Sequence, residues 1–120
     1  MFRVIVAGSR NFSNFRLLEE KLDKLLRTKH APMILSGAAP GADRLGEKYA
    51  AKRGFPLIRY PAQWSRYGIQ AAKIRNAQMA EEADAVVVFW DGKSSGSRHM
   101  IQLADRKKLP LRVIRTDEKG

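Results

Sequence analysis

The chain contains no cysteine and only two histidines among its 120 residues. Without cysteine it can form neither a disulfide framework nor a catalytic thiolate. The two histidines, His30 and His99, lie far apart in the sequence, so we expect no histidine-based metal site and no cofactor. Long apolar runs are also missing. The N-terminal run, residues 2–7, is too short for a signal peptide, and nothing is long enough to span a membrane. We therefore expect a soluble, cytoplasmic protein.

Acidic residues are scarce beside basic ones. There are 12 Asp and Glu residues against 23 Lys and Arg residues, which gives a formal net charge of +11. Such an excess favours polyanionic partners, either nucleic acid or phosphorylated small molecules. The basic residues are dispersed, however, and the one local run, Arg106-Lys107-Lys108, suits the C-terminus of a helix. Charge alone predicts affinity for anions without naming the kind of anion.

Apolar runs and amphipathic segments alternate along the chain. The apolar runs predict strands at residues 2–7, 32–35, 56–60, 85–90 and 110–114. The segments between them predict four helices, beginning after a cap at Ser13 or Asn14, at Ala42, at Ala71 and near Ser97. Residues 62–69 are expected to be the longest irregular piece.

This alternation predicts an α/β fold, because right-handed crossovers place helices on both faces of a parallel sheet. We expect a three-layer sandwich with a five-stranded parallel sheet in the order 3-2-1-4-5. One domain covers residues 1–115, and residues 116–120 form a frayed tail.

The turn between the second strand and the second helix is built of small residues. It runs from Ser36 to Asp43, and nothing larger than Pro40 precedes the aspartate. Small residues let a ligand approach the backbone closely, and the free N–H groups and dipole of the following helix favour an anion. We interpret this turn as a phosphate-binding loop. The alternative is a tight turn that needs glycine for its own geometry.

Two further loops are expected at the same edge of the sheet. In this strand order, ligands bind beyond the carboxyl ends of the strands, where the winding reverses. The loops that meet there are Gly8–Asn11, Ser36–Asp43 and Asp91–Ser97, and two of them carry cations, Arg10 and Lys93. Their shared composition of Gly, Ser and small residues strengthens the prediction of a phosphate site.

Familiar nucleotide motifs do not match. Gly8-Ser9-Arg10 offers one glycine where a dinucleotide dehydrogenase needs G-x-G-x-x-G. Gly92-Lys93-Ser94 imitates the end of a Walker A loop, but Val87 stands where that loop needs its first glycine, which excludes a P-loop ATPase. There is no paired-carboxylate site, and Ser36 and Ser94 lack a nearby histidine base.

A set of motifs in a specific order covers nearly the whole chain. They are Gly8-Ser9-Arg10, Ser36-Gly37-Ala38 with Gly41-Ala42-Asp43, Ile74-Arg75-Asn76 with Met79-Ala80, Ala83-Asp84-Ala85, and Trp90-Asp91-Gly92 with Ser94 and Gly96-Ser97. The chain thereby resembles the YspA, cpYpsA-related branch of the SLOG superfamily. That superfamily is Rossmann-like and includes the Lonely-guy phosphoribohydrolases, DNA-processing protein A and nucleotide-sensing domains of defence systems.

The resemblance implies a nucleotide or nucleotide-derived ligand seated on the loops after strands 1, 2 and 4. The ligand-binding residues it implies are Gly8, Ser9, Arg10, Ser36, Gly37, Ala38, Gly41, Ala42, Asp43, Arg75, Asn76, Asp91, Gly92, Ser94, Gly96 and Ser97.

Catalysis is where the chain departs from the Lonely-guy pattern. Those enzymes have an Arg ahead of a Met and then P-G-G-x-G-T-x-x-E with a catalytic glutamate. Arg75 and Met79 match the first part and Gly96-Ser97 matches G-T, but the glutamate falls at His99 or Met100. Arg98 and His99 thus offer a cation and an imidazole where a carboxylate should stabilise the developing charge on the ribose.

Five further side chains have specific candidate roles. Arg10 fits a bidentate phosphate partner. Arg75, near a helix start where the dipole disfavours cations, needs a ligand phosphate or a carboxylate such as Asp91. Asp43 suits a helix N-terminus by itself. Trp64 and Tyr67 either stack on a base or cover a sheet edge.

Three functions remain open. The first is a domain that binds or senses a nucleotide. The second is a hydrolase of a nucleotide's N-glycosidic or phosphoanhydride bond, for which Arg75, Asp91 and Asp43 are the catalytic candidates. The third is single-stranded DNA binding in the manner of DNA-processing protein A. A homo-oligomer is compatible with each.

Overall fold

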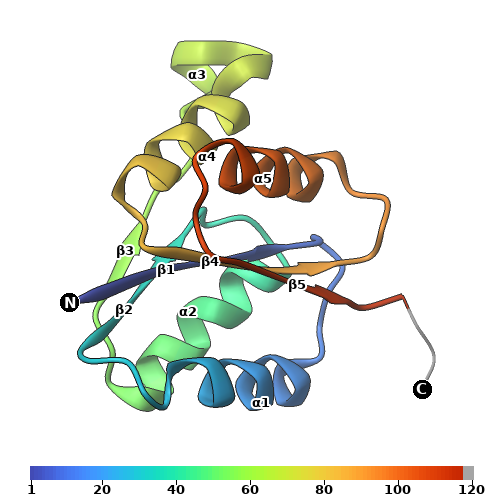
Figure 1. Cartoon of the computed structure of the whole chain (residues 1–120). Helices are drawn as coiled ribbons and strands as arrows, with labels where there is room; N and C mark the ends of the chain where they lie inside the picture. The colour runs from blue at the N-terminus through green and yellow to red at the C-terminus, as the bar shows by residue number, and fades with distance from the viewer. Residues whose placement is uncertain (118–120) are drawn as a thin grey trace.

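Each apolar run expected to form a strand does so, and the strands make one parallel sheet. The structure is a computed structural model that describes residues 1–117. The strands are β1 (Phe2–Gly8), β2 (Pro32–Ser36), β3 (Leu57–Arg59), β4 (Ala85–Trp90) and β5 (Leu111–Arg115). Their order is β3-β2-β1-β4-β5, and every neighbouring pair is parallel, which confirms the predicted α/β fold and strand order (Figure 1).

Helices cover both faces of this sheet. Figure 1 shows α1 (Phe15–Leu26) and α2 (Ala42–Arg53) on one face, with α4 (Ala71–Glu82) and α5 (Ser95–Arg106) on the other. Each face has its own buried cluster, because successive side chains of a strand point to opposite sides. Val4 and Val6 of β1 pack toward α1 and α2, whereas Ile5 of the same strand packs toward α4 and α5.

Helices α1, α2 and α5 follow the expected apolar spacing. Helix α1 buries Leu18, Leu22 and Leu26, and of the two proposed caps Asn14 is used, since its side chain accepts from the Leu17 N–H at 3.0 Å. Helix α4 differs, because it buries Arg75 and Asn76 together with Met79 and Ala80. A polar pair on the buried face of α4 marks the side of the sheet on which the site is built.

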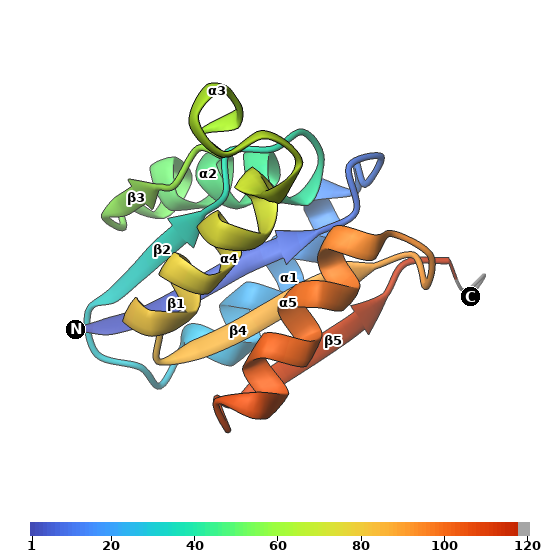
Figure 2. The same cartoon turned by 90° about the horizontal axis from the view of Figure 1, so that it is seen from above.

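The segment expected to be irregular, residues 62–69, is instead largely helical. It holds a single turn, α3 (Trp64–Tyr67), followed by the 3-10 turn η1 (Gly68–Gln70), and Figures 1 and 2 show it projecting beyond α4. Neither element buries a residue. Because no side chain is buried here, the sequence of this segment shows no helical spacing of apolar residues. Trp64 and Ile69 are 51% and 88% exposed.

The C-terminal end follows β5 closely. Thr116, placed in the predicted tail, still donates its N–H to the Trp90 carbonyl at 2.9 Å. The rest of that predicted tail, residues 118–120, lies outside the described residues. Among residues 1–117, the structure contains no helix with the length and apolar character needed to cross a membrane.

Candidate functional site

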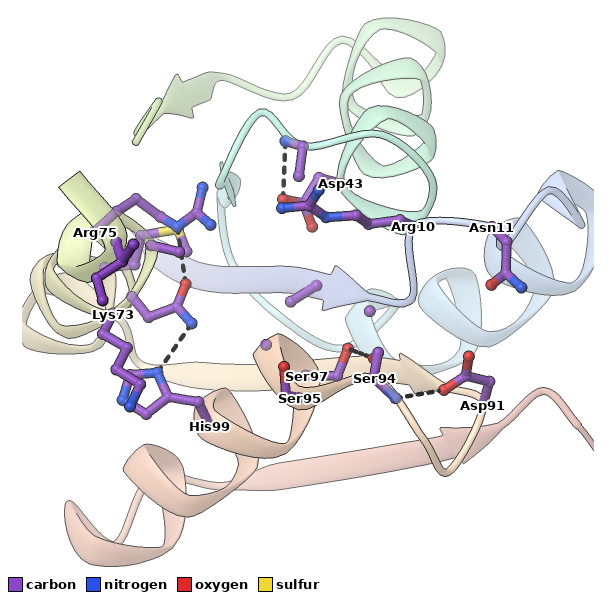
Figure 3. A pocket seen from close by; sticks show the side chains of 18 of the residues that line it. Arg10, Asn11, Asp43, Lys73, Arg75, Asp91, Ser94, Ser95, Ser97 and His99 are labelled. Carbon is purple, nitrogen blue, oxygen red and sulfur yellow. Dashed lines mark hydrogen bonds between the residues drawn. The ribbon is translucent and has the colours of Figure 1, made fainter. Parts of the chain in front are cut away.

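A cavity of about 560 Å³ opens at the carboxyl ends of β1 and β4, beside α4. This is the edge of the sheet where the strand order led us to expect a ligand. Figure 3 shows side chains from both halves of the fold converging on it. Its lining is made by Ala7, Gly8, Arg10, Asn11, Ala39, Asp43, Trp64, Ile69, Ala72, Lys73, Arg75, Asn76, Met79, Asp91, Ser94, Ser95, Gly96, Ser97 and His99.

The cavity gathers part of the predicted ligand-binding set. The predicted residues that line it are Gly8, Arg10, Asp43, Arg75, Asn76, Asp91, Ser94, Gly96 and Ser97. Those that do not are Ser9, Ser36, Gly37, Ala38, Gly41, Ala42 and Gly92. Most of this second group belongs to the Ser36–Asp43 turn, whose own contacts account for the difference.

The β2–α2 turn is filled by the protein itself. The fully buried Ser36 hydroxyl donates to Glu47 Oε2 at 2.7 Å and accepts from the Ala38 N–H at 3.0 Å. The Asp43 carboxylate accepts from the Ala39 N–H at 3.1 Å, and the first N–H of α2, on Ala42, donates to the Ser9 carbonyl at 3.2 Å. Several polar groups that we expected to face a ligand are thus already bonded.

Gly41 meets backbone at close range. Its φ is +83°, and a Cβ there would lie 2.2 Å from the Ser9 carbonyl oxygen and 2.5 Å from that of Arg10. Only glycine tolerates this combination of backbone conformation and crowding. The glycine therefore serves the contact between two loops, which favours the alternative of a turn that needs glycine for its own geometry.

The β4–α5 turn is arranged differently, because its helix start is open. Asp91 Oδ1 accepts from the N–H groups of Lys93 and Ser94 at 2.8 and 2.9 Å. The Ser94 and Lys93 N–H groups lower the pKa of the Asp91 carboxyl, which keeps it ionised. Within residues 1–117, the N–H groups of Ser95, Gly96 and Ser97 have no acceptor, as expected for the first turn of a helix.

A row of serine hydroxyls runs along the base of this open helix start. Ser9 Oγ accepts from the Asp91 N–H at 2.9 Å and lies 3.4 Å from Ser94 Oγ. Ser94 Oγ in turn donates to Ser97 Oγ at 2.7 Å, so the hydroxyl hydrogen of Ser97 remains available to a further acceptor. Ser9 therefore contacts Ser94 without lining the cavity itself.

Arg75 brings a cation to the opposite wall. Only 8% exposed, it donates from Nη1 to the carbonyls of Gly37 and Tyr60 and from Nε to Asn76 Oδ1. Asp91, the carboxylate expected to compensate it, is not its partner. Burial lowers the pKa of Arg75, while the charge of Asp43 raises it.

One nitrogen of Arg75 is left open. Its Nη2 has no partner within residues 1–117, and in that range every fully buried polar side-chain atom is bonded. Nη2 is therefore reachable by a ligand.

Asp43 is a buried carboxyl on the cavity wall. Desolvation raises its pKa from the ordinary 3.8 to about 6, although the Ala39 N–H and the charges of Arg75 and Arg10 act in the opposite direction. Figure 3 shows the Arg10 guanidinium beside this carboxyl.

At the far end of the cavity, Asn76 Nδ2 lies 3.1 Å from His99 Nδ1. Burial, then the charges of Lys73 and Arg106, lower the pKa of His99. The expectation that Arg98 supplies a cation here is wrong, because its guanidinium lies 5.6 Å from the centre of the Trp90 ring, outside the cavity lining. Lys73 of α4 provides the cation instead.

Several lining residues were absent from the predicted set, namely Ala7, Asn11, Ala39, Trp64, Ile69, Ala72, Lys73, Met79, Ser95 and His99. A helical period could have revealed some of them. Ala72, Arg75, Asn76 and Met79 stand at i, i+3, i+4 and i+7, and together they form the face of α4 that lines the cavity. The exposed rim residues Trp64 and Ile69 had no such pattern.

Comparison with known proteins agrees with the motif order. The family model of the YspA, cpYpsA-related SLOG family matches residues 2–67. Gene 61 protein of Mycobacterium phage D29 is 30% identical over an alignment of 118 residues, and the match covers 92% of this chain and 94% of that protein. The X-ray structure of TM1055, a structural genomics target, superposes with a TM-score of 0.69 at 19% identity, over 92% of this chain and 72% of the other, and shows a shared fold. The chain belongs to the YspA, cpYpsA-related SLOG family.

Proposed function

We propose that this protein binds a nucleotide or nucleotide-derived ligand in the 560 Å³ cavity, with a phosphoryl group at the start of α5. The observation that carries this proposal is the open helix start, where three N–H groups without acceptors among residues 1–117 stand beside the Ser97 hydroxyl. Helix N-termini with free N–H groups attract phosphate through hydrogen bonds and the helix dipole. Arg10 and Arg75, from the loop after β1 and from α4, line the same cavity and add positive charge.

The rim of the cavity supplies a surface for the base. Trp64 and Ile69 both line it and are exposed, so their apolar faces are available for a planar ring. Tyr67, the other aromatic residue considered for this role, does not line the cavity, and Arg66 lies over its ring at 5.1 Å. Of the two aromatic residues, Trp64 is the one we assign to the base.

Titration calorimetry with AMP tests this function. We expect wild-type protein to bind AMP, and Ser97→Ala to weaken binding by about 1 kcal/mol, the size of one hydrogen bond. Ser13→Ala is the matched control, because Ser13 is exposed and lines no cavity described here. Absence of AMP binding, or equal affinities of wild type and Ser97→Ala, would contradict the proposal.

Hydrolysis is the second candidate, and one observation favours it. Two carboxyl groups line the cavity with pKa values displaced in opposite directions, Asp43 upward and Asp91 downward. A protonated acid beside an ionised carboxylate is a common arrangement for glycosidic hydrolysis. Against it, His99 lines the cavity where the related enzymes carry a glutamate.

Chromatography of protein incubated with AMP separates the two functions. We expect intact AMP, because no carboxylate replaces that glutamate on α5. Release of adenine that is lost in Asp91→Asn would assign the chain to the enzymes instead.

A further inference from the structure

We propose that the ligand has a second half, joined to the nucleotide through a phosphoryl group held by Arg10 and Arg75, which occupies a neighbouring cavity. This inference rests on the proposed function and deepens it. It names the ligand as a nucleoside diphosphate linked to a small uncharged group, such as a sugar.

The second cavity adjoins the first. It has a volume of about 310 Å³ and lies between the Gly37–Pro40 segment and the Pro61–Ala62 segment. Arg10, Ala39, Trp64 and Arg75 line both cavities and so form a shared wall. A ligand that reaches from one cavity to the other therefore passes these side chains.

Two cations of the shared wall have donor groups that bind nothing else among residues 1–117. Arg10 is exposed and makes no hydrogen bond or ion pair within the described part of the chain. Arg75 keeps Nη2 open, although its other nitrogens are bonded. The two guanidinium groups are close enough for the charge of Arg10 to lower the pKa of Arg75.

Two like-charged neighbours favour an anion between them, and the shared wall itself contains no carboxyl group. Asp43, whose charge acts on both arginines, lines the first cavity and not the second. A phosphoryl group bears at least two free oxygens, so one oxygen can accept from Arg75 Nη2 while another accepts from the Arg10 guanidinium. The shared wall thus has the chemistry of a phosphoryl seat separate from the start of α5.

The rest of the second cavity restricts the group beyond that phosphoryl. Apart from the shared wall, its lining is Gly37, Ala38, Pro40, Pro61 and Ala62. None of these side chains is charged or bulky, so nothing there recognises a further ion. A compact uncharged group, held by contacts with small side chains and backbone, fits this lining.

Calorimetric titration with AMP, ADP and ADP-glucose tests the inference. We expect affinity to rise along this series, with ADP-glucose bound at least tenfold more tightly than AMP. Arg10→Ala should remove most of the gain from AMP to ADP.

Ala62→Trp isolates the second cavity, because Ala62 lines it and not the first. This change should abolish the gain from ADP to ADP-glucose and leave AMP affinity unchanged. Ala62→Leu is a milder variant with the same expected direction, and Ala51→Trp on the exposed side of α2 is the control for an added indole. Thermal melting verifies that each variant is folded.

The outcomes separate the two proposals. AMP binding with no gain for ADP-glucose would overturn the second half of the ligand and leave the proposed function standing. Equal loss of AMP and ADP-glucose affinity in folded Ala62 variants would also overturn it. Failure of the wild type to bind any of the three nucleotides would overturn both.

Discussion

Two strand-to-helix turns of similar composition meet at the edge of the sheet, yet one is closed and the other open. In the β2–α2 turn, the Ser36 hydroxyl, the Asp43 carboxylate and Gly41 contact the chain itself. In the β4–α5 turn, the N–H groups of residues 95–97 have no acceptor within the described residues, and no heavy atom lies within 4 Å of the position of a Cβ on Gly96. The first turn builds the wall of the cavity, and the second offers it donors.

The difference shows that small residues in a turn indicate a close neighbour, but they do not indicate whether that neighbour is a ligand or another part of the protein. At Gly41 the neighbour is the backbone of the β1–α1 loop, and at Gly37 it is the Arg75 guanidinium, 2.7 Å from the position of a Cβ. A phosphate would have demanded the same residues. The first N–H of each helix distinguishes the two cases, since that of Ala42 donates to the Ser9 carbonyl and that of Ser95 has no acceptor within the described residues.

Glycine-to-alanine changes give the sharpest contrast between the turns. Gly41→Ala should lower the free energy of unfolding by about 4 kcal/mol, through backbone strain and the clash with Ser9 and Arg10. Gly96→Ala should change it by about 0.5 kcal/mol or less, because the added methyl group enters open space at a helix start. Urea denaturation of both variants measures the difference. Similar stability of the two would mean that the β2–α2 turn is not closed by its own contacts.

The buried carboxyl of the closed turn makes stability depend on pH. The pKa of Asp43 is about 6 in the folded chain against 3.8 ordinarily, so the folded state binds more protons between these values. The free energy of unfolding should therefore fall as pH rises from 4 to 7, by about 2 kcal/mol from this group. Asp43→Asn should lack that fall, and denaturant melts at several pH values compare the two. Parallel stability profiles for wild type and variant would contradict this.

Ser36 of the β2–α2 turn and Ser94 of the β4–α5 turn give the smallest expected effects, which separate stability from ligand affinity. Ser36→Ala should lower the free energy of unfolding by about 1–2 kcal/mol, because Ala38 N–H and Glu47 lose a buried partner, while AMP affinity stays unchanged. Ser94→Ala should do the reverse, with stability unchanged within about 0.5 kcal/mol and AMP affinity reduced about threefold. Melting and calorimetry on the same samples decide it. A loss of AMP affinity in Ser36→Ala together with a loss of stability in Ser94→Ala would place the ligand on the β2–α2 turn.

Much of the fold could be predicted because burial leaves patterns of apolar residues in the sequence. β4 is a continuous apolar run because its side chains are buried on both faces of the sheet. The turn α3 could not be predicted in this way, since one helical turn without a buried residue has no period. The edge of the sheet at which the cavity opens followed from strand order alone.

The hydrogen-bond partners of individual polar residues could not be predicted from the sequence. A carboxylate partner was expected for Arg75, but Arg75 bonds to the Gly37 and Tyr60 carbonyls. Those bonds depend on where two loops distant in sequence lie in the fold. The sequence predicted Arg98 as the cation near His99, but Lys73 lines the cavity there instead. The direction of a long side chain is set by its neighbours, and the Arg98 guanidinium lies over the Trp90 ring.

The bond between Asn76 and His99 also decides which tautomer the imidazole adopts. Asn76 Oδ1 already accepts from Arg75 Nε, so the amide presents its NH₂ group to His99, and Nδ1 must be the bare, accepting nitrogen. The proton then resides on Nε2, and a second proton on Nδ1 would bring two donors face to face. His99 is thereby kept neutral as a donor with one fixed direction, and Asp43, with its pKa of about 6, is the group that changes the charge of the cavity as the pH passes just below neutral.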